Sequence, residues 1–141
     1  MKAVLTALAL MLSVPPLHAD SAAVAAKVVV RPVASATETS SGQPIVLPQG
    51  QVQTLVSTYD IPPGAVLPKH KHPFPRYAYV LAGTLKVTNL DIGRTDTFKA
   101  GDFILEAVDQ WHQGANTGTE SVKLLVIDMV EKGRSNVVLH E

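Results

Sequence analysis

The chain has 141 residues, with 12 basic and 12 acidic side chains and no cysteine. A chain of this length forms one domain, and its balanced charge excludes the basic surface that nucleic acids or anionic membranes would bind. Without cysteine, disulfides, thiolate metal ligands and cysteine nucleophiles are also excluded, so the core alone must stabilise the fold.

The first 19 residues have the pattern of a signal peptide. Lys2 supplies the positive start, residues 3–14 form an apolar stretch, and Ala19 offers a small residue at the cleavage point. The apolar stretch is too short to span a hydrocarbon core of about 30 Å. We therefore expect residues 1–19 to be removed and the protein to be exported, to the periplasm or outside the cell, with no membrane association after cleavage.

Residues 20–43 are predicted to form a flexible N-terminal segment. They are rich in Ala, Val, Ser and Thr and contain few large side chains. The sequence KVVVRPV at 27–33 is compatible with a short edge strand, where proline is tolerated. The sequence SATETSSGQP that follows at 35–44 is typical of a mobile linker.

From residue 44 onward the pattern is that of β-strands. Short runs rich in Val, Ile, Leu, Thr and Tyr alternate with clusters of Gly, Pro, Asn and Asp. This alternation indicates an all-β sandwich or barrel, and seven prolines between positions 44 and 75 exclude a long helix there. We predict a single antiparallel β-barrel over residues 44–132 and a loose C-terminal tail at 133–141.

Three histidines stand where strand geometry can bring them together. His70 and His72 are two residues apart, so in an extended chain they project from the same face. His112 follows two further turn signals, where a neighbouring strand can present it inward. Neutral imidazole is a common ligand of Fe, Cu, Zn and Ni, so the three residues are candidate metal ligands. His140, in the tail, is expected on the surface.

Two stretches around these histidines resemble the two motifs of the cupin superfamily. The first contains Gly64, His70, His72, Arg76 and Gly83, and the second contains Gly101, Ala107, Asp109, His112 and Asn116. Arg76 stands at the place of the usual glutamate, Ala107 at that of the usual proline and Asp109 at that of the usual glycine. The resemblance is to small single-domain cupins of type 2. It implies a double-stranded β-helix, or jelly-roll barrel, with a metal held by His70, His72 and His112 and the fourth ligand position vacant.

Arg76 allows three interpretations, because arginine has no lone pair with which to bind a metal. In the first, three histidines hold the metal and Arg76 turns to an anionic substrate, as the resemblance to glutamate-lacking cupin dioxygenases implies. In the second, Arg76 pairs with an internal carboxylate, Glu106 or Asp109, which can itself reach the metal. In the third, metal binding has been lost and the pocket binds an anion or nothing.

The sequence therefore predicts an exported metal-binding cupin that acts on a small anionic molecule. The leading hypothesis is a dioxygenase-like mononuclear enzyme with Fe, Mn, Cu, Zn or Ni on three histidines and Arg76 as a catalytic residue. The alternative is a periplasmic metal- or ligand-binding cupin without turnover. Catalysis needs an open pocket of roughly 300 Å³ or more, whereas a binder can be closed. Tyr77 and Tyr79 should face outward, where small cupins pack sheet on sheet, so we expect a homodimer.

Overall fold

The computed structural model describes residues 27–141. The predicted signal peptide, residues 1–19, lies outside the described residues, as do residues 20–26. Within the described part of the chain, no helix is long and apolar enough to cross a membrane. The β fold lies in the unit that runs from Arg31 to Glu141.

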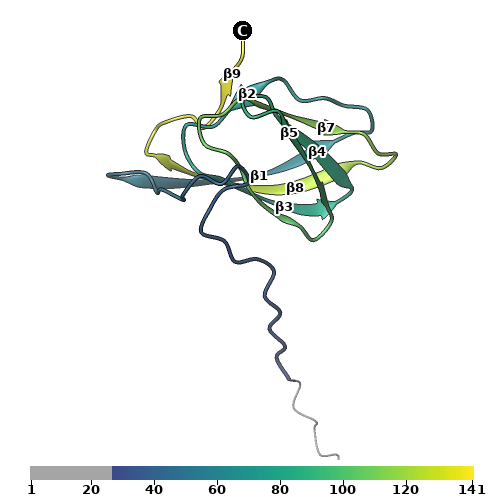
Figure 1. Cartoon of the computed structure of the whole chain (residues 1–141). Coiled ribbons are helices and arrows are strands. Elements are labelled where there is room, and N and C mark those ends of the chain that lie inside the picture. The colour runs from purple at the N-terminus through teal and green to yellow at the C-terminus, as the bar shows by residue number, and fades with distance from the viewer. Residues whose placement is uncertain (1–26) are drawn as a thin grey trace, which may run out of the picture. The chain divides into compact units, whose positions relative to one another are not determined.

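Two antiparallel sheets make up this fold (Figure 1). The first sheet has the strand order β1–β8–β3–β6, and the second has the order β5–β4–β7–β2–β9. The strand bounds are β1 Val52–Ile61, β2 His70–Lys71, β3 Arg76–Ala82, β4 Thr84–Asn89, β5 Arg94–Lys99, β6 Phe103–Leu105, β7 His112–Asn116, β8 Val122–Glu131 and β9 Val138–Leu139. The predicted all-β antiparallel barrel is confirmed.

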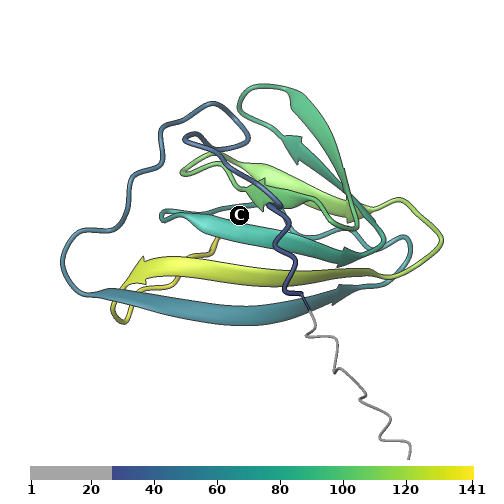
Figure 2. The ribbon, with the colours of Figure 1, turned by 90° about the horizontal axis from the view of Figure 1, so that it is seen from below.

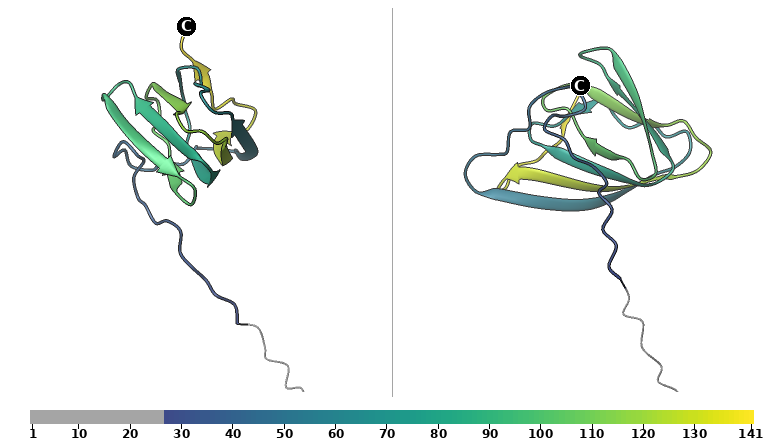
Figure 3. Two further views of the ribbon diagram at one scale, coloured as in Figure 1. Left: turned by 90° about the vertical axis from the view of Figure 1, so that its right-hand side faces the viewer. Right: turned by 60° about the horizontal axis from the view of Figure 1, so that its bottom comes forward.

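The core lies between the two sheets, whose layers are visible in Figures 2 and 3. Successive side chains of a strand point to opposite faces, and β8 follows this rule along its whole length and β3 as far as Val80, after which its register shifts. In β3, Ala78 and Val80 are buried, whereas Tyr77 and Tyr79 are only half-buried. Arg76 shares the buried face with Ala78 and Val80, as its spacing from them predicts.

The central part of the opposite side of the first sheet is uncharged, and we call this central part the outer face. Across the four strands, Val56, Ile127, Tyr77 and Leu105 lie in one register row. The rings of Tyr77 and Phe103 stack there, with centroids 6.2 Å apart. By register and alternation the outer face consists of Thr54, Val56, Thr58, Tyr77, Tyr79, Phe103, Leu105, Leu125, Ile127 and Met129. The charged residues Asp60, Lys123 and Glu131 lie on the same side of the sheet, at the ends of β1 and β8.

The segment before β1 differs from its prediction in two places. Residues 27–33 form no strand and are fully exposed, since their valines find no buried partner. Residues 39–43, predicted as part of a mobile linker, pack against the barrel instead. The Gln43 side chain donates to the carbonyl of Val108 at 2.8 Å and accepts from its amide at 2.9 Å. Ser40 N–H donates to the Leu105 carbonyl at 2.7 Å, so this polar segment is held by backbone hydrogen bonds.

The C-terminal residues predicted as a loose tail also contact the barrel. Strand β9 pairs with β2, with His70 opposite Leu139 and Lys71 opposite Val138. Asn136, which precedes β9, is only 3% exposed. His140 lies on the exposed surface, as expected, with its ring 4.7 Å from that of Trp111. The barrel therefore extends beyond the predicted boundary at residue 132.

Candidate metal centre

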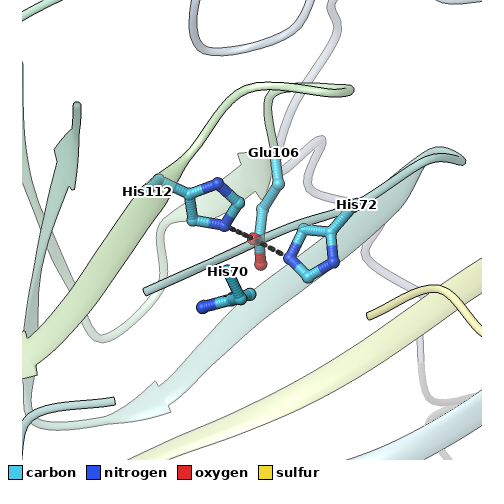
Figure 4. A group of neighbouring side chains, drawn as sticks. All are labelled: His70, His72, Glu106 and His112. Carbon is cyan, nitrogen blue, oxygen red and sulfur yellow. Dashed lines mark hydrogen bonds and ion pairs between the residues drawn. The ribbon is translucent and has the colours of Figure 1, made fainter. Parts of the chain in front are cut away.

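The strand register brings the three histidines together. His70 in β2 lies directly opposite His112 in β7, and His72 follows two residues after His70 on the same face. Their ring centroids are 4.4 to 4.8 Å apart. All three are buried, with exposed fractions of 8%, 0% and 4% for His70, His72 and His112. The predicted convergence of these three rings is thus present in the structure (Figure 4).

Each imidazole is oriented by a hydrogen bond from its Nδ1 atom to a backbone carbonyl. The distances are 2.8 Å from His70 to Pro68, 2.6 Å from His72 to Asn136 and 2.8 Å from His112 to Gln110. A carbonyl oxygen only accepts, so each Nδ1 carries the proton and, in the neutral ring, Nε2 carries the lone pair. This is the arrangement by which proteins orient histidines that bind a metal through Nε2.

A carboxylate completes the cluster. Glu106 Oε2 lies 3.0 Å from Nε2 of His72 and 3.1 Å from Nε2 of His112 (Figure 4). Only the contact with His112 has hydrogen-bond geometry. Nε2 of His72 is completely buried and has no hydrogen-bond partner among residues 27–141, although Glu106 is near. A buried nitrogen without a partner is costly, so this atom indicates a ligand at the centre of the cluster.

The cluster perturbs the pKa values of its members. Burial lowers the pKa of His70 to about 4. Burial would raise the pKa of Glu106, but the imidazoles of His112 and His72 close to its carboxylate outweigh burial and hold that pKa far below its usual range. Burial would likewise lower the pKa of His112, yet its hydrogen bond with Glu106 raises that pKa. Glu106 is therefore ionised, as a metal ligand must be.

These four side chains fit a divalent transition metal. Their ligand atoms all lie within 4.8 Å of one another, and they supply three neutral nitrogens and one anionic oxygen. Imidazole suits Fe, Cu, Zn and Ni, whereas Ca²⁺ and Mg²⁺ prefer sites built from oxygen alone. The cluster can thus hold a metal ion, and the donor types do not select one metal among these.

The fourth ligand position was expected to be vacant, and the structure brings Glu106 beside the three histidines, where it could serve as the fourth ligand. Its carboxylate comes from the end of β6 rather than from β3, where the first motif normally supplies it. Strand alternation carries the signal for this placement, because Ile104 is buried in the core and Glu106 is two residues further on. The second interpretation of Arg76 named Glu106 as a carboxylate that can reach the metal, and the geometry agrees with that part of it.

Arg76 pairs with a carboxylate that the sequence interpretation did not name. Its Nε donates to Asp128 Oδ1 at 2.7 Å and its Nη2 donates to Oδ2 at 2.9 Å. The two residues lie opposite each other on β3 and β8 and both face inward, which explains the pairing. Asp109, the other expected partner, is instead an exposed residue 2.9 Å from Lys71. It has a positive φ of 57°, which explains why the family favours glycine at this place.

The net buried charge of the metal-loaded site would be smaller than that of the ion and Arg76 alone. A divalent ion and Arg76 would together carry about three positive charges, and the carboxylates of Glu106 and Asp128 balance two of them. Arg76 keeps one side of its guanidinium away from Asp128, with Nη1 3.4 Å from the Tyr59 hydroxyl. Its role in catalysis stays a prediction.

A narrow cavity inside the barrel connects these groups. Its walls include His70, Glu106 and His112 as well as Arg76 and Tyr59, and apolar residues of both sheets complete it. The centres of water-sized molecules can occupy about 30 Å³ of it. This space is far below the roughly 300 Å³ expected of a pocket for a larger substrate. The cavity holds molecules of only a few atoms.

Comparison with known proteins agrees with this architecture. Residues 57–128, more than half of the chain, match the family described as Cupin domain. No curated protein matches the chain. The polyketide cyclase RemF from Streptomyces resistomycificus is 23% identical, with a TM-score of 0.54 over 69% of this chain and 68% of that chain.

Two further solved structures share the fold. The oxalate decarboxylase of Lactobacillus farciminis, determined as a formate complex, is 24% identical, with a TM-score of 0.53 over 61% of this chain and 26% of that chain. The DMSP lyase DddQ from Ruegeria pomeroyi is 20% identical, with a TM-score of 0.53 over 61% and 42%. At these identities the likeness shows the fold, and activity does not follow from it.

Proposed function

Since this chain belongs to the cupin family, we propose that it is a mononuclear metalloprotein that acts on a small anionic molecule. His70, His72, Glu106 and His112 would hold a divalent transition metal ion. The observation that carries the proposal is the unpartnered Nε2 of His72 in a buried cluster of three imidazoles and one carboxylate. In its more specific form, the protein is an oxidoreductase of dioxygenase-like type.

The chemistry divides between the ion and the cavity walls. A bound divalent ion polarises an oxygen ligand and, when it is Fe, Mn or Cu, can exchange electrons with it. Nη1 of Arg76 and the Tyr59 hydroxyl are hydrogen-bond donors in the same cavity, where they can orient an anion beside the cluster. Apolar walls such as Leu85 and Val126 limit the access of water and strengthen these contacts.

The small size of the cavity limits the proposed ligand to a carboxylate of at most three carbons. The centres of water-sized molecules can occupy only about 30 Å³ of the cavity. A sugar or an aromatic ring therefore does not fit inside the barrel in this conformation. The structure of the oxalate decarboxylase relative was determined with formate, which is a ligand of this class. Formate and oxalate are therefore the first anions to test.

The alternative function is a metal- or ligand-binding cupin without turnover. One observation favours it specifically, since the cavity is about a tenth of the size expected for a substrate pocket. In addition, two of the three guanidinium nitrogens of Arg76 are already bound to Asp128. A closed site of this kind can sequester an ion as well as use it.

Three measurements test the proposal. Elemental analysis of protein purified without a histidine tag, followed by titration with Mn, Fe, Cu, Zn and Ni, should show about one metal per chain. A protein that contains none of these metals and binds none would refute both functions. Formate or oxalate should change the electron paramagnetic resonance spectrum of the Mn- or Cu-loaded protein. Consumption of oxygen or of the acid would then support the enzyme, and binding without consumption the alternative.

The proposal also places the protein outside the cytoplasm, as a homodimer. Lys2 followed by the apolar residues 3–14 supports export. The uncharged outer face supports self-association, because it can pack against the same face of a second copy without bringing like charges together. Cell fractionation tests the first statement, and sedimentation tests the second.

A further inference from the structure

One of the three histidines is oriented by a residue that lies far from it in the sequence. His70 and His112 each donate to a carbonyl two residues away in their own segment. His72 instead donates to the backbone carbonyl of Asn136, which lies 64 residues further along the chain, at 2.6 Å. Local backbone therefore sets two of the rings, whereas the third depends on how the segment between β8 and β9 is held.

Asn136 is itself held from two sides. Its Nδ2 donates to Asp128 Oδ1 at 2.6 Å, and its Oδ1 accepts from the backbone N–H of Phe74 at 2.8 Å. The Asn136 residue is 3% exposed and Asp128 is 6% exposed, so both contacts are shielded from water. These two hydrogen bonds leave the Asn136 carbonyl little freedom relative to the imidazole that it accepts from.

Asp128 is fixed in turn by the paired hydrogen bonds from Arg76. Burying an ion pair is expensive, and apolar residues of similar size often stabilise a core equally well. The particular property of a two-bond arginine–carboxylate pair is its defined geometry. The pair at this position thus provides orientation more than stability, and the group it orients is Asn136.

We propose that Arg76, Asp128 and Asn136 act together as positioning residues for His72, so that the C-terminal segment is a functional part of the metal centre. The inference rests on the proposed function, because it concerns how the cluster holds its ion. It also accounts for a cation near the metal site: the charge of Arg76 is directed to Asp128, which connects it to His72 through Asn136. None of the three residues needs to touch the metal.

The test replaces Asn136 and measures metal affinity. The affinities for Zn²⁺ and Cu²⁺ are obtained by competition with a chelator, and the Cu²⁺ electron paramagnetic resonance spectrum reports the ligand geometry. Removing a group that orients a metal ligand weakens affinity by about 10- to 100-fold. We expect Asn136→Ala to show this loss and an altered spectrum. If Asn136→Ala does not fold, Asn136→Ser, which keeps a polar group but cannot reach Asp128, carries the same test.

One control separates positioning from simple destabilisation. Val130→Ala removes a completely buried side chain from β8 outside the network, so it should lower the melting temperature and leave the affinity unchanged.

The failure of this inference is distinguishable from the failure of the proposed function. A wild-type protein that binds neither ion would refute the proposed function, and the inference with it. A wild-type protein that binds, together with an Asn136→Ala variant of wild-type affinity and spectrum, would overturn the inference alone. A Val130→Ala variant that loses as much affinity as Asn136→Ala would overturn it as well, because general destabilisation would then explain the loss.

Discussion

Replacing Glu106 with glutamine tests the central feature of the site, its single negative ligand. The substitution keeps the shape of the side chain and removes its charge. Glu106 Oε2 lies 3.0 and 3.1 Å from two ligand nitrogens, so it occupies the middle of the cluster rather than its edge. An interaction with a charged group contributes about 1.5–3 kcal/mol. At about 1.4 kcal/mol per decade, metal affinity should fall roughly 10- to 150-fold.

The same variant should change the titration of a neighbouring histidine. The pKa of His112 is raised mainly by its hydrogen bond with Glu106, against the lowering effect of burial. Without the carboxylate, burial dominates, and the His112 pKa of the metal-free protein should fall. Nuclear magnetic resonance of the imidazole protons as a function of pH measures this change, while calorimetric titration with Zn²⁺ measures the affinity.

Asp109→Asn is the matched control for Glu106→Gln. Asp109 belongs to the same motif and carries the same charge, but its side chain is 64% exposed and pairs with Lys71 on the surface. This change should alter neither the affinity nor the His112 titration. A Glu106→Gln variant whose metal affinity stays within threefold of wild type would refute the assignment of Glu106 as a ligand.

Three further predictions concern stability and assembly. The pKa of His70 is about 4 in the folded protein and 6.5 in the unfolded chain, so the unfolded chain binds more protons between these pH values. For His70 alone, the metal-free protein should lose on the order of 3 kcal/mol of unfolding free energy as pH falls from 6.5 to 4, measured by urea denaturation. His70→Asn should reduce this dependence on pH. Gly83→Ala should destabilise by about 2 kcal/mol or more in thermal unfolding, because φ is +75° and a Cβ would lie 2.7 Å from the Ser121 carbonyl oxygen; an unchanged melting temperature would contradict that geometry. Tyr77→Glu should convert the homodimer to a monomer in sedimentation, whereas Val66→Glu, at an exposed position, should leave the dimer intact. A dimer in both variants would exclude the outer face as the dimer interface.

The parts of this site that sequence alone predicts are those fixed by local spacing. The interval of two between His70 and His72 places both rings on one face in any strand. The alternation through Arg76, Ala78 and Val80 predicts which side chains are buried, and the structure agrees. The fold follows from such local rules, since strand length, turn residues and alternation all appear in the sequence itself.

The parts that sequence reasoning missed depend on pairings between distant strands. Nothing near Arg76 in the chain identifies Asp128 as its partner, because that choice depends on the register of β3 against β8. The contact from His72 to Asn136 likewise joins residues 64 positions apart. Gln43 illustrates the same limit, since a linker-like composition conceals its two hydrogen bonds to Val108.

The short length of β2 has a consequence for the lifetime of the protein. This strand has only two residues, yet it carries His70 and lies between β7 and β9. On the proposed function, a bound ion would link β2 to the loop after β6 and to β7. A free metal concentration of 1,000 times Kd would then add about 4 kcal/mol to the free energy of unfolding. Proteases cleave protein molecules that have locally or globally unfolded, so the metal supply would affect how much of this protein escapes proteolysis. On the proposed function, metal-free protein would therefore be degraded faster than metal-loaded protein.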